Sequence, residues 1–252
     1  PMLQQAETLA RTLAAMRDAR GSLDFDLPEP EFRFNEDGTL AAVQPREHHF
    51  GHRLIEEFMI AANEAVARFL AGHKQPCLYR VHQKPDPDKL SALMTFLSKS
   101  GLEAVLSPSG KPLVRKGKKQ LLPPTAADLR RIMAAASGLP QEYTINRLIL
   151  RSMMQARYSP ENEGHFGLAS DCYCHFTSPI RRYADLVVHR ALKLALGMAP
   201  LAEERPPSLV RLEAVADQIN ATERTAMEAE REIHKRLTIL FLRDKVGAVF
   251  DG

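Results

Sequence analysis

Two adjacent arginines at the start of an expected helix are the strongest candidates for chemistry in this chain. The run Ser178-Pro179-Ile180-Arg181-Arg182 predicts a hydroxyl-bearing turn that enters a helix. Backbone N–H groups at a helix N-terminus carry partial positive charge and suit an anion. An arginine there opposes the helix dipole, so a phosphate beside Thr177 and Ser178 would relieve that cost. In the alternative interpretation, both arginines form ion pairs with acids such as Asp185.

Histidines and cysteines lie just before this turn. His165 and His175 are candidates for function, although a single histidine is more often structural. Cys172, Cys174 and His175 suggest zinc. However, the gap between the two cysteines is tighter than the usual two residues, and a chain with three cysteines has no second pair. The spacing therefore favours two small core cysteines on one face of a strand over 172–177.

Two further groups invite a functional interpretation. Glu56 and Glu57 lie next to each other on an expected helix, where neighbouring side chains point about 100° apart, so only one of them can face a given partner. They could equally be two acids that favour the helix N-terminus. Phe25, between Asp24 and Asp26, is either a core anchor or an exposed stacking platform, and the residues alone favour the core.

The elements that must position these residues are mostly helices. Apolar spacing predicts helices over 3–19, 50–70, 86–100, 125–136, 143–156, 179–196 and, as one or two helices, 208–246. Short strands are expected over 77–81 and 172–177, with a hairpin over 31–45 that turns at Asp37-Gly38. On the second helix the expected apolar face comprises Leu54, Ile55, Phe58, Met59, Ala62, Val66 and Phe69. The basic segment 107–121 is either a solvated loop or a rim that attracts phosphate. The total favours a helix-rich α+β fold over a doubly wound sheet.

Composition excludes several protein classes. The 252 residues are 44% hydrophobic and 26% charged, which excludes a disordered tail, a collagen-like repeat and a low-complexity linker. The net charge of +3 does not by itself indicate nucleic acid. Three cysteines indicate a reducing compartment, and no apolar run approaches the ~20 residues that cross a bilayer. We expect a soluble, cytoplasmic protein with no membrane partner and no dinucleotide cofactor. We also expect the chain to be a piece of a longer protein.

The run HFGLASDCYCHFTSPIRRYADLVVHR closely resembles the signature of the ribonuclease II / ribonuclease R family of processive exoribonucleases. The segments GSLDFDLPE, IEEFMIAANEAVA, YRVHQKPD, LILRSMMQARYSPENEGHFGLA and TERTAMEAEREI…VGAVFDG resemble the same family in the same order. This series spans nearly the whole chain, and its order is highly specific. The resemblance implies an α+β fold with a mixed sheet wrapped by helices. It implies that residues 1–246 are the C-terminal portion of the RNB-type catalytic domain and that 247–252 begin an OB-type RNA-binding domain.

The resemblance also implies an activity. Family members hydrolyse single-stranded RNA from its 3′ end to nucleoside 5′-monophosphates, with Mg²⁺ ions that activate water and stabilise the leaving oxygen. Arg181 matches the arginine held against the scissile phosphate, with Arg182 beside it. Phe25 matches the aromatic that clamps the terminal bases, which reverses the core interpretation. One glutamate of the pair Glu56 and Glu57 matches a contact to the last nucleotide. Residues of the motif that lines the channel floor are His165, Tyr173, Thr177 and Ser178.

One departure from the family pattern concerns the metal. The family's Mg²⁺ ligands are clustered aspartates that lie N-terminal to the first helix of this chain, and no segment here carries three or four aspartates within about ten residues. We therefore expect this chain to bind RNA without supplying metal ligands, and to need the preceding part of the domain as its partner. The alternatives are a non-catalytic RNA-binding module derived from the same family, or a helical interaction domain that binds no RNA.

Overall fold

The computed structural model describes residues 1–23, 29–99, 125–198, 206–243 and 245–249. Its helices are α1 (Met2–Arg20), α2 (Phe50–Gly72), α3 (Pro87–Lys99), α4 (Ala126–Ala136), α5 (Glu142–Ser152), α6 (Tyr183–Ala195) and α7 (Leu209–Arg243). Its strands are β1 (Pro30–Phe34), β2 (Leu40–Pro45), β3 (Tyr79–Val81) and β4 (Arg157–Ser159). The expectation of a helix-rich chain with short strands is confirmed, and the segment 208–246 contains one long helix.

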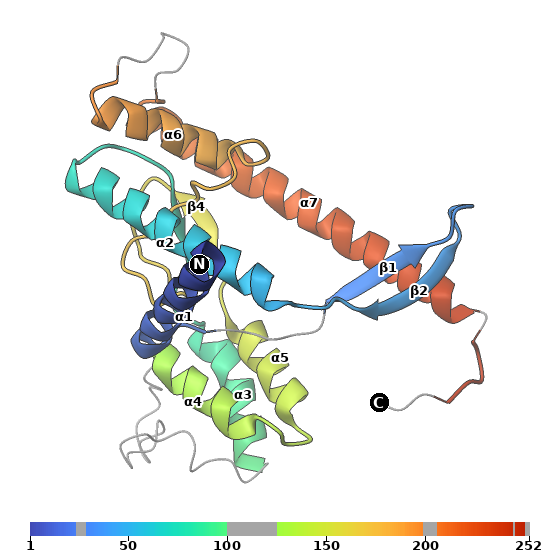
Figure 1. Cartoon of the computed structure of the whole chain (residues 1–252). Coiled ribbons are helices and arrows are strands. Elements are labelled where there is room, and N and C mark those ends of the chain that lie inside the picture. Colours follow the sequence, from blue (N-terminus) through green and yellow to red (C-terminus); the bar gives the residue numbers. More distant parts are fainter. Residues whose placement is uncertain (24–28, 100–124, 199–205, 244, 250–252) are drawn as a thin grey trace.

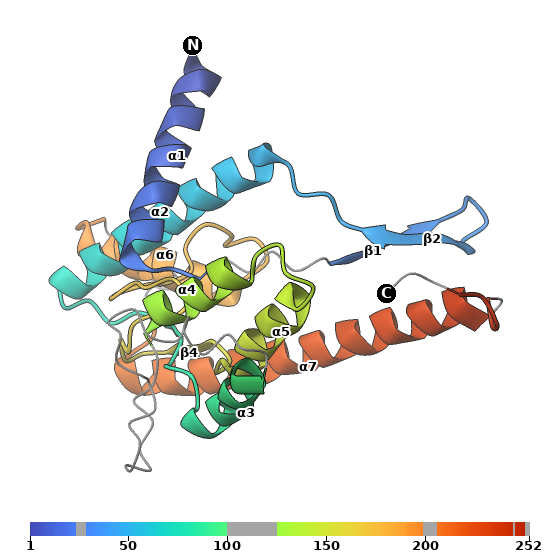
Figure 2. The ribbon, with the colours of Figure 1, turned by 90° about the horizontal axis from the view of Figure 1, so that it is seen from below.

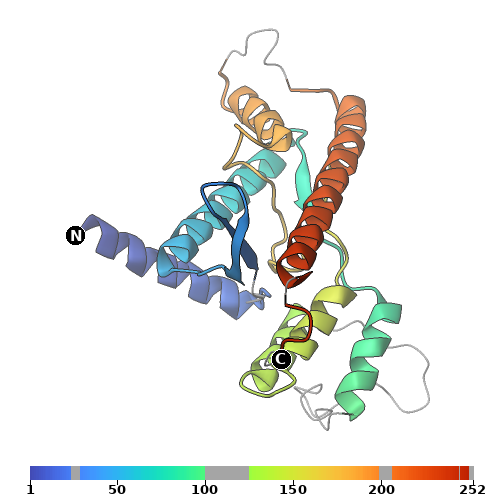
Figure 3. The ribbon, with the colours of Figure 1, turned by 90° about the vertical axis from the view of Figure 1, so that its right-hand side faces the viewer.

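The elements pack around separate buried apolar clusters and leave two extended arms. Helices α3, α4 and α5 enclose one apolar core, while α2, α6 and β3 enclose another (Figures 1 and 3). The N-terminal half of α1 projects from the body, and the β1–β2 hairpin lies along the distal half of α7 on the other side (Figures 1 and 2). The paired arginines lie at the start of α6, beside β4 and α7.

The strands form two separate antiparallel ribbons. Strand β1 pairs with β2 from Pro30↔Pro45 to Phe34↔Leu40, with an irregularity between Arg33 and Phe34. Strand β3 pairs with β4, and Tyr79 lies opposite Ser159. Within the part of the chain that is described, the strands therefore do not form the mixed sheet that the family resemblance implies; a single parallel bridge joins His82 and His165 outside them.

The buried face of α2 differs from the expected apolar face. Ile55 is 55% exposed and Met59 is 37% exposed, so the apolar stripe lies partly in solvent. The buried positions are Glu57, Ile60, Asn63, Glu64, Ala67 and Leu70. Polar residues at these positions have partners on other elements, and that pairing offsets the cost of burying them. Periodicity identified the helix correctly and placed Val66 and Phe69 against the core, but it assigned Ile55 and Met59 to the inner face wrongly.

The segment before α6 also differs from expectation. Residues 172–177 do not form a strand, and α6 begins at Tyr183 with Arg182 as its N-cap residue instead of beginning at the Ser-Pro pair. The carbonyl of Ser178 accepts hydrogen bonds from the N–H groups of Arg181 and Arg182, which closes a single turn outside the helix. The arginines therefore precede the first helical turn.

Candidate nucleic-acid interface

One completely buried carboxylate fixes the turn that carries the arginines. Asp185, in the first turn of α6, has 0% exposure. Its carboxylate accepts hydrogen bonds from Nε and Nη2 of Arg182, each at 2.8 Å, and from the N–H of Ser178 at 2.8 Å. The bidentate ion pair and the backbone contact together hold both ends of the turn. The pairing alternative thus applies to Arg182.

Arg181 is different. Its side chain is exposed, and it has no hydrogen bond or ion pair with any residue that the structure describes. It lines a groove of about 520 Å³ that lies between β4, the arginine-bearing turn and α7. The groove is also lined by Tyr158, Arg182, Thr222 and Glu223. An unpaired guanidinium at the edge of an open groove is available to an anion, with its planar fork of donors free for two hydrogen bonds.

The opposite wall of the groove contains a second ion pair. Nη1 of Arg80 lies 2.7 Å from Oε2 of Glu223, and the guanidinium carbon of Arg80 lies 4.6 Å above the Tyr158 ring. Glu223 is therefore balanced by Arg80, just as Arg182 is balanced by Asp185. Arg181 is the lining charge left without a partner, so the groove attracts negative charge at that point.

Behind the groove, aromatic rings form a continuous stack. Neighbouring ring centroids lie between 5.1 and 5.9 Å apart, in tilted or edge-to-face contacts. In order, the rings are His82, His165, Tyr173, His175 and Tyr158. Two of the residues assigned to the channel floor, His165 and Tyr173, therefore support the groove from within.

The histidines of this stack are held as neutral rings. Burial, with smaller effects from nearby positive groups, lowers the pKa of His165 to about 3 and that of His175 to about 3. Burial also lowers the pKa of His82. The Gly167 N–H lies 2.9 Å from Nδ1 of His82, and Nε2 of that ring lies 2.7 Å from the Met154 carbonyl. These partners require Nδ1 to accept and Nε2 to donate, which a neutral imidazole does.

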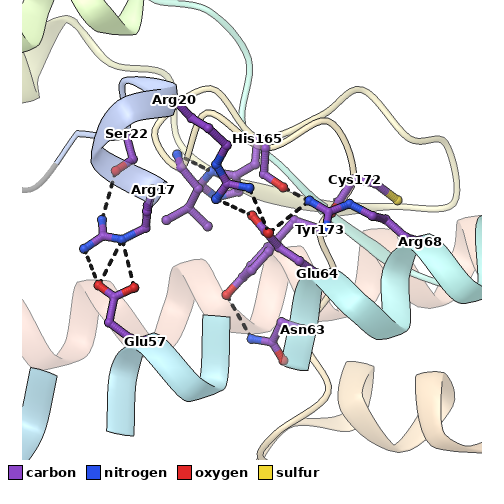
Figure 4. A network of polar contacts seen from close by, with 12 residues as sticks. Arg17, Arg20, Ser22, Glu57, Asn63, Glu64, Arg68, His165, Cys172 and Tyr173 are labelled. Atoms are coloured by element: carbon purple, nitrogen blue, oxygen red, sulfur yellow. Dashed lines mark hydrogen bonds and ion pairs between the residues drawn. The ribbon is translucent and has the colours of Figure 1, made fainter. Parts of the chain in front are cut away.

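An asparagine from α2 holds the start of the arginine-bearing segment. Asn63 is 3% exposed, and its Nδ2 donates to the Tyr173 hydroxyl at 2.9 Å (Figure 4). Its Oδ1 accepts from the N–H of Phe176 at 2.9 Å. On the other side, Nε2 of His189 in α6 lies 2.9 Å from the Phe176 carbonyl, and the two rings stack with centroids 4.1 Å apart.

The structure separates the two adjacent glutamates. Glu57 is 6% exposed, and its Oε1 lies 2.7 Å from Nη2 of Arg17 in α1 (Figure 4). Glu64, about two helical turns further along α2, accepts from Arg20 in the same way at 2.9 Å. Glu56 is exposed and does not line the groove. Glu57 therefore joins α1 to α2, and Glu56 is the glutamate whose carboxylate faces solvent.

The cysteines are core residues. Cys77, Cys172 and Cys174 are free thiols buried in one apolar cluster, which confirms the core interpretation although they do not lie on a strand. Burial raises the pKa of Cys77 to about 12. Across the described ranges, no group of three or more His, Cys, Asp or Glu side chains is arranged to hold a metal ion.

Some predicted features have other outcomes. Phe25 and the basic segment 107–121 lie outside the described residues. Thr177 is half-buried between the Asn63 and Asp185 contacts, next to Ser178. None of the described helices has the length and hydropathy needed to cross a bilayer.

Comparison with known proteins identifies the family. The model of the RNB domain matches residues 1–198. This chain is an RNB domain family member. Ribonuclease R of Aquifex aeolicus is 41% identical over 250 residues, which cover 99% of this chain and 33% of that protein. Ribonuclease R of Escherichia coli is 34% identical over 257 residues, covering 99% of this chain and 30% of that protein. The chain thus spans about a third of the length of these curated relatives.

The fold is similar to solved RNB proteins. The Mycoplasma genitalium RNase R in complex with ribose methylated single-stranded RNA superposes with a TM-score of 0.84 at 31% identity, covering 98% of this chain and 37% of that chain. The same protein in complex with double-stranded RNA gives a TM-score of 0.84 and covers 42% of that chain. Yeast Ssd1, a pseudonuclease, shares the fold at a TM-score of 0.53 and 24% identity.

Sequence reasoning missed several residues of this RNB site. Asn63, Arg80 and Glu223 lie on three different elements and meet the motif only after folding. One signal for Asn63 was available: it lies at helical spacing with the apolar Ile60 and Ala67, so it is expected on the buried face. A buried asparagine requires hydrogen-bond partners. No local pattern links Arg80 to Glu223, which lie 143 residues apart.

Proposed function

We propose that this chain is the C-terminal portion of the catalytic domain of a cytoplasmic, processive 3′-to-5′ exoribonuclease. The intact enzyme hydrolyses single-stranded RNA to nucleoside 5′-monophosphates. The observation that carries this proposal is that two adjacent arginines have different environments. Arg182 is bound to the buried Asp185, while Arg181 is left unpaired in an open groove. The relatives named ribonuclease R and the RNA-bound RNase R structures support it. Residues 1–246 and 247–252 keep the domain assignments that the resemblance implies.

Arg181 stabilises the phosphate that reacts. Its guanidinium offers two parallel donors to the phosphate oxygens, and its interaction strengthens as negative charge develops there. Arg182 does not compete for the phosphate, because Asp185 occupies its Nε and Nη2. The hydroxyls of Thr177 and Ser178 lie on the same turn and contact the RNA backbone.

The Mg²⁺ ligands of the intact enzyme lie outside this chain. The described residues do not fit a magnesium site, because they bring no group of three or more ligand side chains together. The aspartate ligands belong to another part of the intact enzyme, and this chain contributes positioning of the RNA.

The other RNA contacts are assigned from whether each side chain is exposed to solvent or already paired. Glu56, with a solvent-facing carboxylate, contacts the last nucleotide, whereas Glu57 is engaged by Arg17. His165 and Tyr173 support the channel floor through their ring stack. Phe25 stacks on the terminal bases.

Replacing Arg181 tests the proposal. In the full-length protein we expect Arg181→Ala to slow RNA hydrolysis by about 10² or more with little change in RNA affinity, since positioned charge is used mainly in the transition state. Arg147→Ala, a change at an exposed arginine of α5 outside the groove, should leave the rate unchanged. Single-turnover decay of a labelled single-stranded RNA with Mg²⁺ gives both rates.

Three outcomes separate the alternatives. Unchanged turnover in Arg181→Ala would remove the proposed role. RNA binding without decay by the full-length protein would favour the non-catalytic RNA-binding module. Affinity that is absent, or that does not fall with salt, would favour the helical interaction domain, because phosphate contacts make affinity steeply salt-dependent. The 252-residue chain alone should not degrade RNA, and clean decay by it would contradict the metal assignment.

A further inference from the structure

We infer that Asn63 is a positioning residue that acts through Arg181, an inference that rests on the proposed function. Asn63 touches neither the groove nor the arginine. Its amide instead joins two points of the segment that leads to the arginine, the Tyr173 hydroxyl and the Phe176 N–H, each at 2.9 Å. Its own backbone carbonyl accepts from the Cys174 thiol at 3.5 Å, between those two points.

These contacts replace a strand ladder. Residues 174–178 have no regular secondary structure, so their backbone groups need other partners. The Phe176 N–H bonds to Asn63 of α2, and the Phe176 carbonyl bonds to His189 of α6. Both polar backbone groups of Phe176 are therefore held by side chains, and Asn63 supplies the contact to α2.

Arg181 depends on this anchor for its position. Two residues after Phe176, the Ser178 N–H bonds to Asp185, and Arg181 follows within the same turn. Asp185 fixes the turn to α6, and Asn63 fixes the preceding segment to α2. Loss of the α2 anchor frees the entry to the turn, and displacements of about 1 Å at a reacting group cost up to about 10²-fold in rate.

The residue type at position 63 supports this role. An apolar side chain would suit a position that is 3% exposed between Ile60 and Ala67. An amide instead provides one donor and one acceptor, and the segment uses both. The buried Asn146 of α5 provides a contrast, because its Oδ1 has no hydrogen-bond partner among the residues that the structure describes.

The test is a double-mutant cycle in the full-length enzyme, comparing the wild type, Asn63→Leu, Arg181→Ala and the double variant. We expect Asn63→Leu to lower kcat about tenfold or more, with KM for RNA changed less than about twofold. Because Asn63 acts through Arg181, the double variant should be no slower than Arg181→Ala alone. Asn146→Leu, the same substitution at a buried asparagine outside the segment, should combine with Arg181→Ala multiplicatively.

A second measurement also uses the full-length enzyme. Amide hydrogen exchange at Phe176 should accelerate in Asn63→Leu and stay unchanged in Asn146→Leu. Asn63→Ala is measured in parallel, so that a failure of the leucine variant to fold leaves the cycle complete. If Arg181→Ala slows hydrolysis while the Asn63 variants keep kcat, or if the two effects multiply, this inference is wrong and the proposed function stands. If Arg181→Ala itself has no effect, the proposed function fails.

Discussion

Lowering the pH from 7 to 5 tests whether the rings behind the groove are buried as neutral imidazoles. Burial lowers the pKa of His165 and of His175 to about 3, from an ordinary value of 6.5. Arg80 adds to both shifts, and for His175 Arg182 adds while Asp185 opposes. At pH 5 the folded protein therefore keeps both rings neutral, whereas the unfolded chain protonates them.

The sign of the effect follows from the protons bound. Between pH 6.5 and pH 3 the unfolded state binds more protons than the folded state, so the free energy of unfolding decreases as the pH falls. Above pH 6.5 the contribution of the neutral rings is fully present. From pH 7 to pH 5 each histidine costs about 2 kcal/mol, and the two together about 4 kcal/mol, as long as their folded pKa values stay below 5. That is a large part of a typical stability of about 5–15 kcal/mol.

Other groups act in a different pH range. Burial acts to raise the pKa of Glu64, but hydrogen bonds from Arg20 and Ser170 and the charges of Arg20 and Arg68 outweigh it and lower that pKa below the ordinary 4.5. The stability that Glu64 contributes is therefore lost only below about pH 4.5. His82, whose pKa is lowered by burial, acts in the same direction as His165 and His175.

Urea unfolding followed by circular dichroism at pH 7, 6 and 5, at constant ionic strength, measures the effect. His165→Phe and His175→Phe should each reduce the slope of unfolding free energy against pH by about 1.4 kcal/mol per pH unit near pH 5, whatever their stability at pH 7. A wild-type protein equally stable at pH 7 and pH 5 would refute the reasoning, as would a slope that neither substitution changes.

Two further predictions concern buried ion pairs, each measured by thermal or urea unfolding. Asp185→Asn removes the charge that balances Arg182 and should cost about 3 kcal/mol; a stability equal to wild type would mean that solvent already screens the pair. Glu57→Gln breaks the buried contact to Arg17 and should cost about 3 kcal/mol, whereas Glu56→Gln should stay within about 0.5 kcal/mol. Equal costs at the two glutamates would contradict their separation into a structural and a solvent-facing residue.

Local signals predicted the helices well. Helix α1 ends where Gly21 adopts a left-handed conformation with φ of 91°, and α4 begins with the Thr125 side chain capping the Asp128 N–H. Such signals lie within a few residues of the boundary they determine, so the sequence contains them. Strand β4 was missed because its three residues become a strand only by pairing with β3, which lies far away in the chain.

The inner face of α2 could not be inferred from hydrophobicity. Glu57 and Glu64 can be buried because Arg17 and Arg20 of α1 form ion pairs with them (Figure 4). Asn63 can be buried because its amide forms hydrogen bonds with the segment before α6. Each partner belongs to a different element, so no periodicity within α2 reports it. The family resemblance singled out Arg181 for the phosphate, but the residue types and spacing alone did not show which of the two arginines would be free.

The choice between the arginines comes from the capacity of one carboxylate. Asp185 receives three hydrogen bonds, two from Arg182 and one from the Ser178 N–H, which nearly exhausts the roughly four acceptor positions of its two oxygens. Since Asp185 is fully buried, a second guanidinium could reach it only by entering the core and losing its water. Arg181 therefore stays in solvent, and because the same carboxylate fixes the turn from which it projects, its fork faces the groove from a fixed base. One buried acid both neutralises Arg182, which would otherwise compete for phosphate, and positions Arg181, which we propose binds the phosphate.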